Sequence, residues 1–429
     1  MEKTRLKSKF IPSYNGGMED IYAVIDMKSF YASCECATRG LNPFCTPLAV
    51  ADPDRSFNTI VMSCTPYLKE KYHCPNVCRI SELPPIPGLI IAKPRMRYYL
   101  EQSARIVSIF LDFVSEEDLH VYSVDESFLR LTPYLSLYRC TAEDIVRKIQ
   151  NRIQKELRMT ATAGLGPNMF LAKVCLDNEG KKRPPFLARW GKEDVETKLW
   201  SIHPITKIWG ISNGISSHLS RLGIHSLRSL AHADDTMLKK EFGIIGKQLK
   251  DLANGRDESR INEKYVPKEK SLSIGQTLMK DYSAKGATLV LREMNDDLCY
   301  RLRSKFLKAT RIGIYCQYAQ NAGFSRQCSL DIPSNDTDLL FAVVLSLFYR
   351  FVENEPIRGL GIHFQVTESS MSQGSLFESI DEQIQRVRLD QTKDQISQKY
   401  GKNAVLRATS LTKNSTIRER HLQIGGHHA

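Results

Sequence analysis

The sequence predicts a multidomain α+β protein. Its 429 residues are more than a single hydrophobic core usually organises. Short runs with strand character occur together with longer stretches whose apolar residues recur at helical spacing. A charged stretch with a proline, residues 257–270, has the composition of an exposed linker and is the best candidate for a domain boundary.

Two strands are expected to carry acidic residues at their ends. Residues 21–25 form a short apolar run typical of a buried central strand, and Asp26 follows directly. Residues 119–131 have the alternation of a β-hairpin, with Asp125 and Glu126 at or near its turn. An isolated Asp-Glu pair is most often a solvated turn, but this pair has apolar neighbours on both sides.

Three carboxylates that converge from two strands would repel one another and raise each other's pKa. Magnesium ions relieve such repulsion, because they prefer oxygen ligands and keep positions open for substrate phosphates. Two such ions can hold the attacking and leaving oxygens of an in-line phosphoryl displacement. We therefore expect Asp26, Asp125 and Glu126 to form a magnesium site at the ends of two strands.

The elements between these acids follow from turn residues and helical spacing. Residues 34–92 are turn-rich and contain short strands, and 97–114 and 141–158 are expected to be helices that back the sheet. Residues 160–173 predict a strand, a glycine turn and a helix whose N-terminus can bind an anion. The basic triplet at 181–183 is expected to be a solvated or backbone-contacting loop.

The remaining chain predicts a helical hairpin and then an antiparallel sheet covered by two helices. Residues 205–224 indicate two short helices around a glycine turn. After the linker we expect strands at 271–278, 312–318, 324–330 and 360–366 and helices at 293–306 and 338–351. From residue 368 onward we expect a polar, flexible tail, with a helix at 381–400 and an extended basic stretch at 407–429.

Composition points to a protein of the cytosol with a polyanionic partner. Lys and Arg number 60 against 48 Asp and Glu, a formal charge of +12 that favours nucleic acid or an anionic surface. No stretch is typical of a signal peptide or a membrane span, so no membrane partner is expected. The 11 cysteines form no Cys-x-x-Cys pair and are expected to be reduced.

At two of these stretches the sequence resembles a known family. Residues 26–33 (DMKSFYAS) and 122–127 (YSVDES) are similar to the two metal motifs of Y-family translesion DNA polymerases, particularly of their UmuC-like bacterial branch. The resemblance runs from about Met18 to the C-terminus and implies a right-hand polymerase. The implied parts are an N-terminal extension (1–19), palm (20–33 and 93–187), small fingers (34–92), helix-hairpin-helix thumb (188–256), linker (257–270), α/β little finger (271–367) and C-terminal tail (368–429).

The resemblance implies low-fidelity, template-directed DNA synthesis past lesions, in DNA repair and SOS damage tolerance. Asp26 and Asp125 would bridge two Mg²⁺ ions and Glu126 would hold the catalytic one, with the backbone carbonyl of Met27 completing the nucleotide-metal site. The primer 3′-oxygen would then attack a dNTP. The sequence has no second cluster of acidic residues of the kind that would indicate a proofreading nuclease.

Nucleotide contacts are implied for Phe30, Tyr31, Tyr67 and Lys173. Tyr31 would collide with a ribose 2′-hydroxyl and so select dNTP, while core packing is the alternative for this aromatic pair. The sequence departs from the family at two triphosphate-binding positions, where it has Glu70 and Met169; Lys69, Lys71 or Lys173 could replace them, or Lys173 could only pack.

Other partners are implied by the thumb and the tail. Gly210, Gly214 and Gly223 belong to a helix-hairpin-helix that would contact the phosphates of primer-template DNA. Gln373, Leu376 and Phe377 resemble the motif that docks on the bacterial sliding clamp (beta). A recombinase filament or accessory subunits are further candidate partners.

The alternative function is a polymerase-shaped accessory protein that occupies primer ends or the clamp without catalysing synthesis. Glu70 and Met169 favour it, and the complete set of three acids argues against it.

Overall fold

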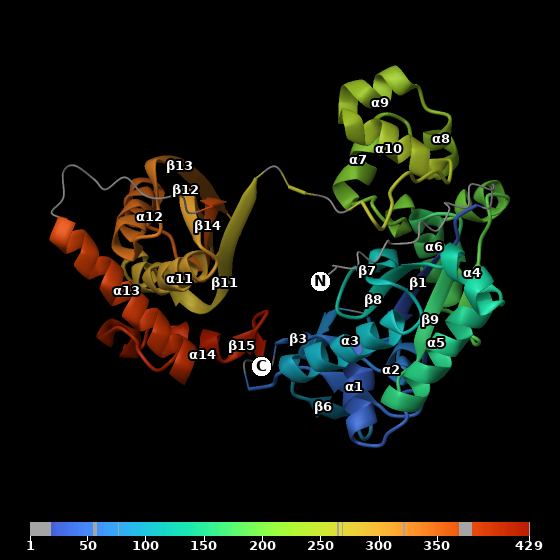
Figure 1. Cartoon of the computed structure of the whole chain (residues 1–429), viewed down its shortest axis with the longest axis horizontal. Helices are drawn as coiled ribbons and strands as arrows, with labels where there is room; N and C mark the ends of the chain where they lie inside the picture. The colour runs from blue at the N-terminus through green and yellow to red at the C-terminus, as the bar shows by residue number, and fades with distance from the viewer. Residues whose placement is uncertain are drawn as a thin grey trace, which may run out of the picture. The chain divides into compact units, whose positions relative to one another are not determined.

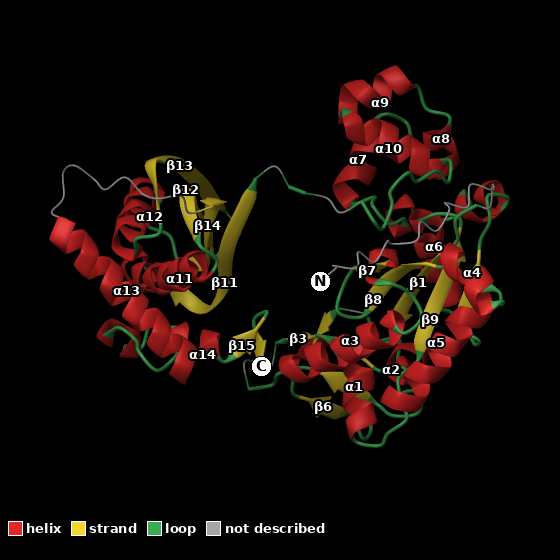
Figure 2. Cartoon of the chain, viewed as in Figure 1, coloured by secondary structure: helices red, strands yellow, loops and turns green. Residues whose placement is uncertain are grey.

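The computed structural model describes residues 19–54, 58–75, 77–263, 266–267, 269–320, 322–368 and 380–428 (Figure 1). The chain divides into two compact units, Met1–Lys264 and Tyr265–Ala429. The boundary between them falls inside the stretch with linker composition. Each unit contains both helices and sheet, so the predicted α+β class is confirmed (Figure 2).

A five-stranded sheet in the order β10-β9-β1-β8-β7 forms the centre of the first unit. Its central strand, β1, pairs antiparallel with both β8 and β9, and all but one of its residues are buried. The strands are β1 (Tyr22–Met27), β7 (Leu119–Val121), β8 (Glu126–Arg130), β9 (Ala161–Gly166) and β10 (Leu187–Arg189).

Amphipathic helices flank this sheet. The predicted helices at 97–114 and 141–158 are α3 (Met96–Leu111) and α5 (Ala142–Leu157), which bury their apolar faces. The further helices of this region are α1 (Phe30–Thr38), α4 (Thr132–Tyr138) and α6 (Met169–Cys175), with a π-helical turn at Leu176–Gly180. The capping box at Thr141 and Asp144 fixes where α5 begins.

Two smaller regions complete the first unit. One contains β2 (Leu48–Val50), β3 (Ile60–Val61), β4 (Ser63–Cys64), α2 (Pro66–Lys71), β5 (Cys78–Arg79) and β6 (Ile90–Ala92), with a 3₁₀ turn at Ile80–Glu82 and another at Glu116–Asp118 nearer the sheet. The other is helical: a π turn at Val195–Leu199, a 3₁₀ turn at Ile205–Lys207, α7 (Asn213–Arg221), α8 (Leu227–Ala231), α9 (Asp235–Phe242) and α10 (Ile244–Ala253). These elements share a core with α6 and β10.

The second unit is an antiparallel sheet in the order β11-β14-β12-β13, packed against two helices. Its elements are β11 (Lys270–Tyr282), α11 (Ala284–Ser304), β12 (Leu307–Tyr318), β13 (Gly323–Ser334), α12 (Thr337–Phe351) and β14 (Ile357–Glu368). All four strands are longer than expected, because alternation continues through polar residues at the strand ends. The order of strands and helices agrees with the prediction.

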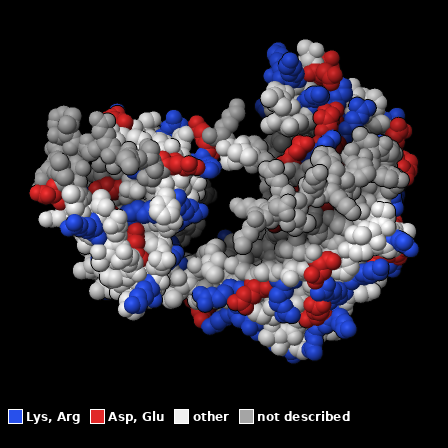
Figure 3. All heavy atoms as spheres, in the orientation of Figure 1, with Lys and Arg blue, Asp and Glu red and all other residues white. Residues whose placement is uncertain are grey.

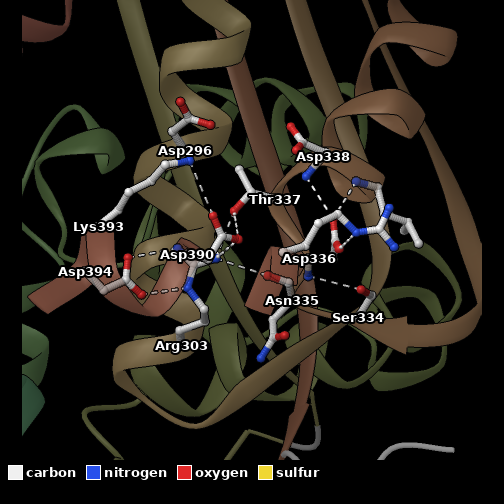
Figure 4. Close-up of polar contacts among 12 residues, drawn as sticks. Asp296, Arg303, Ser334, Asn335, Asp336, Thr337, Asp338, Asp390, Lys393 and Asp394 are labelled. Atoms are coloured by element: carbon white, nitrogen blue, oxygen red, sulfur yellow. Dashed lines mark hydrogen bonds and ion pairs between the residues drawn. The ribbon is translucent and has the colours of Figure 1, made fainter. Parts of the chain in front are cut away.

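We call residues 380–428 the C-terminal segment. The helix expected at 381–400 is confirmed, but the expectations of a flexible tail and of an extended stretch from 407 onward are wrong for the described residues. The segment contains α13 (Ile380–Tyr400), a 3₁₀ turn (Ala408–Leu411), α14 (Ile417–His421), β15 (Gln423–Ile424) and β16 (His427–His428). Arg303 of α11 binds Asp390 and Asp394 of α13 (Figure 4). The buried carboxylate of Glu293 accepts hydrogen bonds from Ser415, Thr416 and Ile417. Long-range ion pairs and hydrogen bonds therefore fix this segment to α11, within the second unit.

Charges of both signs are mixed over the face shown in Figure 3, so the net positive charge does not form one continuous field there. All eleven cysteines lie in the described part of the chain, and each is a free thiol. Within the described ranges, every helix is too short or too polar to cross a bilayer.

Candidate active site

The structure brings the three predicted acids to the same edge of the central sheet. Asp26 lies directly opposite Glu126 in the antiparallel pairing of β1 with β8. Asp125 is the last residue of the preceding turn, and its carbonyl accepts a hydrogen bond of 2.9 Å from the backbone N–H of Met27. The turn closes because the N–H groups of Tyr122 and Ser123 both donate to the carbonyl of Glu126 at 3.0 Å. Two neighbouring buried strands thus fix the backbone of all three acids.

Each carboxylate has a partner other than a metal. Asp26 Oδ2 lies 3.0 Å from Lys181 Nζ, and Glu126 Oε1 lies 2.8 Å from Lys173 Nζ. Asp125 Oδ1 accepts a hydrogen bond of 2.7 Å from Ser123 Oγ. Within the described ranges no three His, Cys, Asp or Glu side chains are turned toward one point in a ligand-like arrangement. The lysines supply the positive charge that three neighbouring carboxylates require.

A ladder of alternating charges connects the two lysines. Asp177 lies 3.1 Å from Lys173 Nζ through Oδ2 and 2.9 Å from Lys181 Nζ through Oδ1. We call the resulting chain Glu126–Lys173–Asp177–Lys181–Asp26 the lysine ladder. Its three middle members are four residues apart along α6 and the π turn, a spacing that puts side chains on one helix face.

The ladder corrects one expectation and refines another. Lys181 was expected in a solvated loop, but its ammonium group lies on Asp26. Lys173 was expected to contact phosphate or to pack; its side chain is only 8% exposed and its ammonium group lies on Glu126. The four-residue spacing of Lys173, Asp177 and Lys181 is the signal in the sequence that these side chains share a helix face, but it does not show that the two lysines reach Glu126 and Asp26.

A cavity of about 390 Å³ opens beside these acids. Asp26 and Asp125 lie on it together with three lysines, Lys28, Lys69 and Lys181. Its remaining lining residues are Met27, Ser29, Phe30, Tyr31, Met62 and Ser63. Carboxylates next to several ammonium groups suit a ligand that is a polyanion bound to a divalent cation.

Burial sets the protonation of these groups. Burial raises the pKa of Asp26 to about 6; the charges of Asp125 and Glu126 add to the rise and Lys181 opposes it. Burial alone would lower the pKa of Lys181, but Asp26 and Asp177 outweigh it and raise that pKa. Burial also lowers the pKa of Lys28 and of Lys69. The crowded acids therefore carry a cost that an added cation would relieve.

The predicted aromatic residues divide into two groups. Phe30 and Tyr31 line the cavity, and the ring of Tyr31 packs 4.8 Å from that of Tyr99. Phe30 and Tyr31 open α1, and Ser29 is the N-cap of this helix. Its φ of 51° is a left-handed conformation that is unfavourable for serine, and it turns the chain sharply after β1. Tyr67 is outside the cavity lining among described residues, and its hydroxyl accepts a hydrogen bond from Lys71 at 2.8 Å.

The three predicted DNA-binding glycines all lie around α7. Gly210 and Gly223 have φ of 92° and 76°, which glycine adopts without strain, and they flank the helix on its two sides. Gly214 is the second residue of α7, whose first turn is capped by Ser212. The predicted clamp-binding residues Gln373, Leu376 and Phe377 lie outside the described residues.

The fold defined by these units is that of a right-hand DNA polymerase of the Y-family. A solved structure of a Y-family DNA polymerase chimera of Dbh and Dpo4 matches 80% of this chain and 98% of its own, with a TM-score of 0.65 and 20% identity. That architecture comprises palm, fingers, thumb and little finger.

Sequence comparison gives the family. Family models described as impB/mucB/samB family and impB/mucB/samB family C-terminal domain match residues 25–177 and 269–376. UvrX of Bacillus subtilis, named for UV-damage repair, is 34% identical over 94% of this chain and 96% of its own. DNA polymerase IV 2 of the same organism is 32% identical over 96% and 99%. The chain therefore belongs to the impB/mucB/samB family, the Y-family of DNA-directed DNA polymerases.

Proposed function

We propose that this protein is a low-fidelity, template-directed polymerase that copies past DNA lesions by two-metal transfer of a nucleotide from dNTP to a primer 3′-OH. One observation carries the proposal. Two adjacent strand ends put Asp26 and Asp125 on the wall of a cavity that also has three lysine ammonium groups. Such a site can accept a triphosphate and its cations together.

Carboxylate and carbonyl oxygens are the ligands that magnesium prefers, and here the acids would exchange their present partners for the ions. Asp26 and Asp125 would hold two ions, with Glu126 on the catalytic one and the Met27 carbonyl completing the nucleotide site. When bound, these ions would neutralise the phosphates and activate the primer oxygen. The protein's own residues position the reactants. The sheet fixes the acids, and the lysines of the cavity bind the triphosphate. Tyr31, held against Tyr99, would exclude a ribose 2′-hydroxyl.

The family's right-hand parts suggest the roles of the other regions. The boundaries stated above for palm, fingers, thumb, linker and little finger remain our proposal. The helices around Gly210, Gly214 and Gly223 would bind the backbone of primer-template DNA. Gln373, Leu376 and Phe377 would dock on the sliding clamp, and the protein would act in the cytoplasm. Replacing both Leu376 and Phe377 with Ala should abolish clamp stimulation of synthesis; undiminished stimulation would exclude that docking.

The test is primer extension with dNTP and Mg²⁺ by the wild type and Asp125→Ala. The substitution should reduce extension by at least about 100-fold, because it removes charge stabilisation at the reacting centre. Glu156→Gln is the matched control, since Glu156 pairs with Arg152 on an exposed helix face. No extension by the wild type, with or without partners, would favour the accessory function.

The same assay tests whether Tyr31 excludes ribonucleotides. Tyr31→Ala should raise incorporation of ribonucleotides relative to dNTP by roughly 10- to 100-fold. An unchanged ratio of ribonucleotide to dNTP incorporation would show that Tyr31 does not select the sugar and that its role is packing.

A further inference from the structure

An aromatic pair joins the acidic turn to the helical thumb region. The indole Nε1 of Trp209 donates a hydrogen bond of 3.1 Å to the hydroxyl of Tyr122. The two rings are nearly perpendicular, with centroids 5.9 Å apart. Trp209 also lies 5.8 Å from Phe128 on β8, and Tyr122 lies 5.6 Å from the same ring. Three aromatic rings from two regions therefore contact one another pairwise.

Each partner lies close to a predicted functional residue. Tyr122 belongs to the turn itself, since its N–H donates to the carbonyl of Glu126, one of the three acids. Trp209 immediately precedes Gly210, where the backbone turns with φ of 92° toward α7. A displacement of α7 would thus reach the turn through Trp209, Tyr122 and one backbone hydrogen bond.

Core packing does not account for Tyr122. Its side chain is on the surface, with 47% of the residue exposed, and it lies beside the equally exposed Val121. Phe128, in contrast, is 1% exposed and belongs to the core of the sheet, against which Trp209 also packs. The hydrogen bond from Trp209, together with the ring contacts to Trp209 and Phe128, therefore orients a phenol that is half exposed to solvent.

We infer that Tyr122 and Trp209 are positioning residues that transmit duplex binding at the thumb to the turn carrying Asp125 and Glu126. The inference rests on the proposed function, because it assumes that the thumb holds DNA and the acids act on nucleotide. Bound duplex fixes α7; Trp209 then holds the Tyr122 side chain, and the turn keeps its acids in place. Without the hydrogen bond, the protein binds duplex normally but positions the acids less well.

The first test is a double-mutant cycle with Tyr122→Phe and Trp209→Phe, which keep aromatic rings and remove one partner each. The maximal rate of single-turnover incorporation at saturating DNA should fall about three- to tenfold in either variant, the range for one neutral hydrogen bond. The double variant should fall by the same factor, because both changes remove one interaction. The dissociation constant for duplex should stay within about twofold.

Trp200→Phe is the matched control, because the indole of Trp200 donates to the carbonyl of Ala253 at 2.8 Å, away from the turn. It should leave the maximal rate unchanged. Rates that multiply in the double variant would overturn the inference, as would losses confined to DNA affinity.

The second test needs no catalysis. Duplex DNA should slow hydrogen exchange at the amides of Tyr122 and Ser123 in the wild type and should not do so in Trp209→Phe. Equal protection in both proteins would overturn the inference. A wild type that incorporates no nucleotide would refute the proposed function, while this exchange difference would still establish or exclude the link.

Discussion

The edge of the central sheet and the second unit both contain networks of alternating charges, but the geometry of the ion pairs differs between the two. In the lysine ladder each ammonium group contacts two carboxylates as a point charge: Lys173 contacts Glu126 and Asp177, and Lys181 contacts Asp177 and Asp26. In the second unit Arg303 is bidentate: Nε and Nη2 lie 2.6 and 2.9 Å from the two oxygens of Asp394, while Nη1 reaches Asp390 (Figure 4). Planar, bidentate pairing is geometrically specific, whereas a flexible lysine can change partner.

The difference in pairing geometry indicates which ion pairs can exchange partners when a ligand binds. A triphosphate entering the palm cavity would compete with Asp26 for Lys181, which is 32% exposed, and so free that carboxylate for a cation. Nothing comparable is required of Arg303, which is 16% exposed and also donates to Thr337. The first network is exchangeable in this view, and the second is structural.

The largest predicted effect is on nucleotide use. Lys181→Met should lower the efficiency of dNTP incorporation by about 100-fold, because a cation that would meet developing charge is lost. Arg303→Met should change the same quantity by less than about twofold, since it lies outside the described lining of the cavity. Steady-state incorporation assays compare the two. Equal losses would mean that the networks do not differ as described.

The next effect is on stability and has the opposite order. Arg303→Met leaves Asp390 and Asp394 half-buried without their main partner, so the free energy of unfolding should fall by about 2–3 kcal/mol. Urea denaturation of the full chain measures it. Arg418→Met, at an exposed arginine of the same segment, should change stability by less than about 0.5 kcal/mol. A loss as large in the control would mean that charge in general matters, not this pairing.

The smallest effect concerns pH. Because the pKa of Asp26 is about 6, a proton competes with a divalent cation for it below that pH. The affinity for Mg²⁺ should rise about tenfold between pH 5 and pH 7 and level off above. Calorimetric titration in two buffers would give both affinity and proton release. Asp26→Asn removes the titrating group, and a dependence as steep in that variant would assign the proton elsewhere.

Local patterns in the sequence were sufficient for the acids but not for their partners. Asp26 ends an apolar run and Asp125 with Glu126 sits in a hairpin, so neighbouring residues alone indicated where they project. Lys181 follows a π turn, and its contact with Asp26 spans 155 positions, which no local periodicity encodes. The sequence could therefore predict that the three acids lie at one edge of the sheet, but not the charged network in which they take part.

The helix of the C-terminal segment was predicted, but its attachment to α11 was missed for the same reason. Helix α13 is mostly polar, which is typical of a solvated tail, and the sequence contains no signal that Asp390 pairs with Arg303, 87 positions earlier. The order of elements in the sheet and helices of the second unit was predictable, since alternation and helical spacing continue over long stretches.

The depth at which α6 and its π turn sit on the sheet has a consequence for inherited variation. A methyl group on Gly164 would lie 2.3 Å from the Ala172 carbonyl oxygen, and one on Gly180 would lie 2.3 Å from that of Ala163. Backbone atoms cannot yield as a side-chain end can, so either alanine would lift the helix and carry both lysines away from their acids. A conservative Gly-to-Ala change far from any reacting atom would thereby lower activity, although every functional side chain would still be present in the protein.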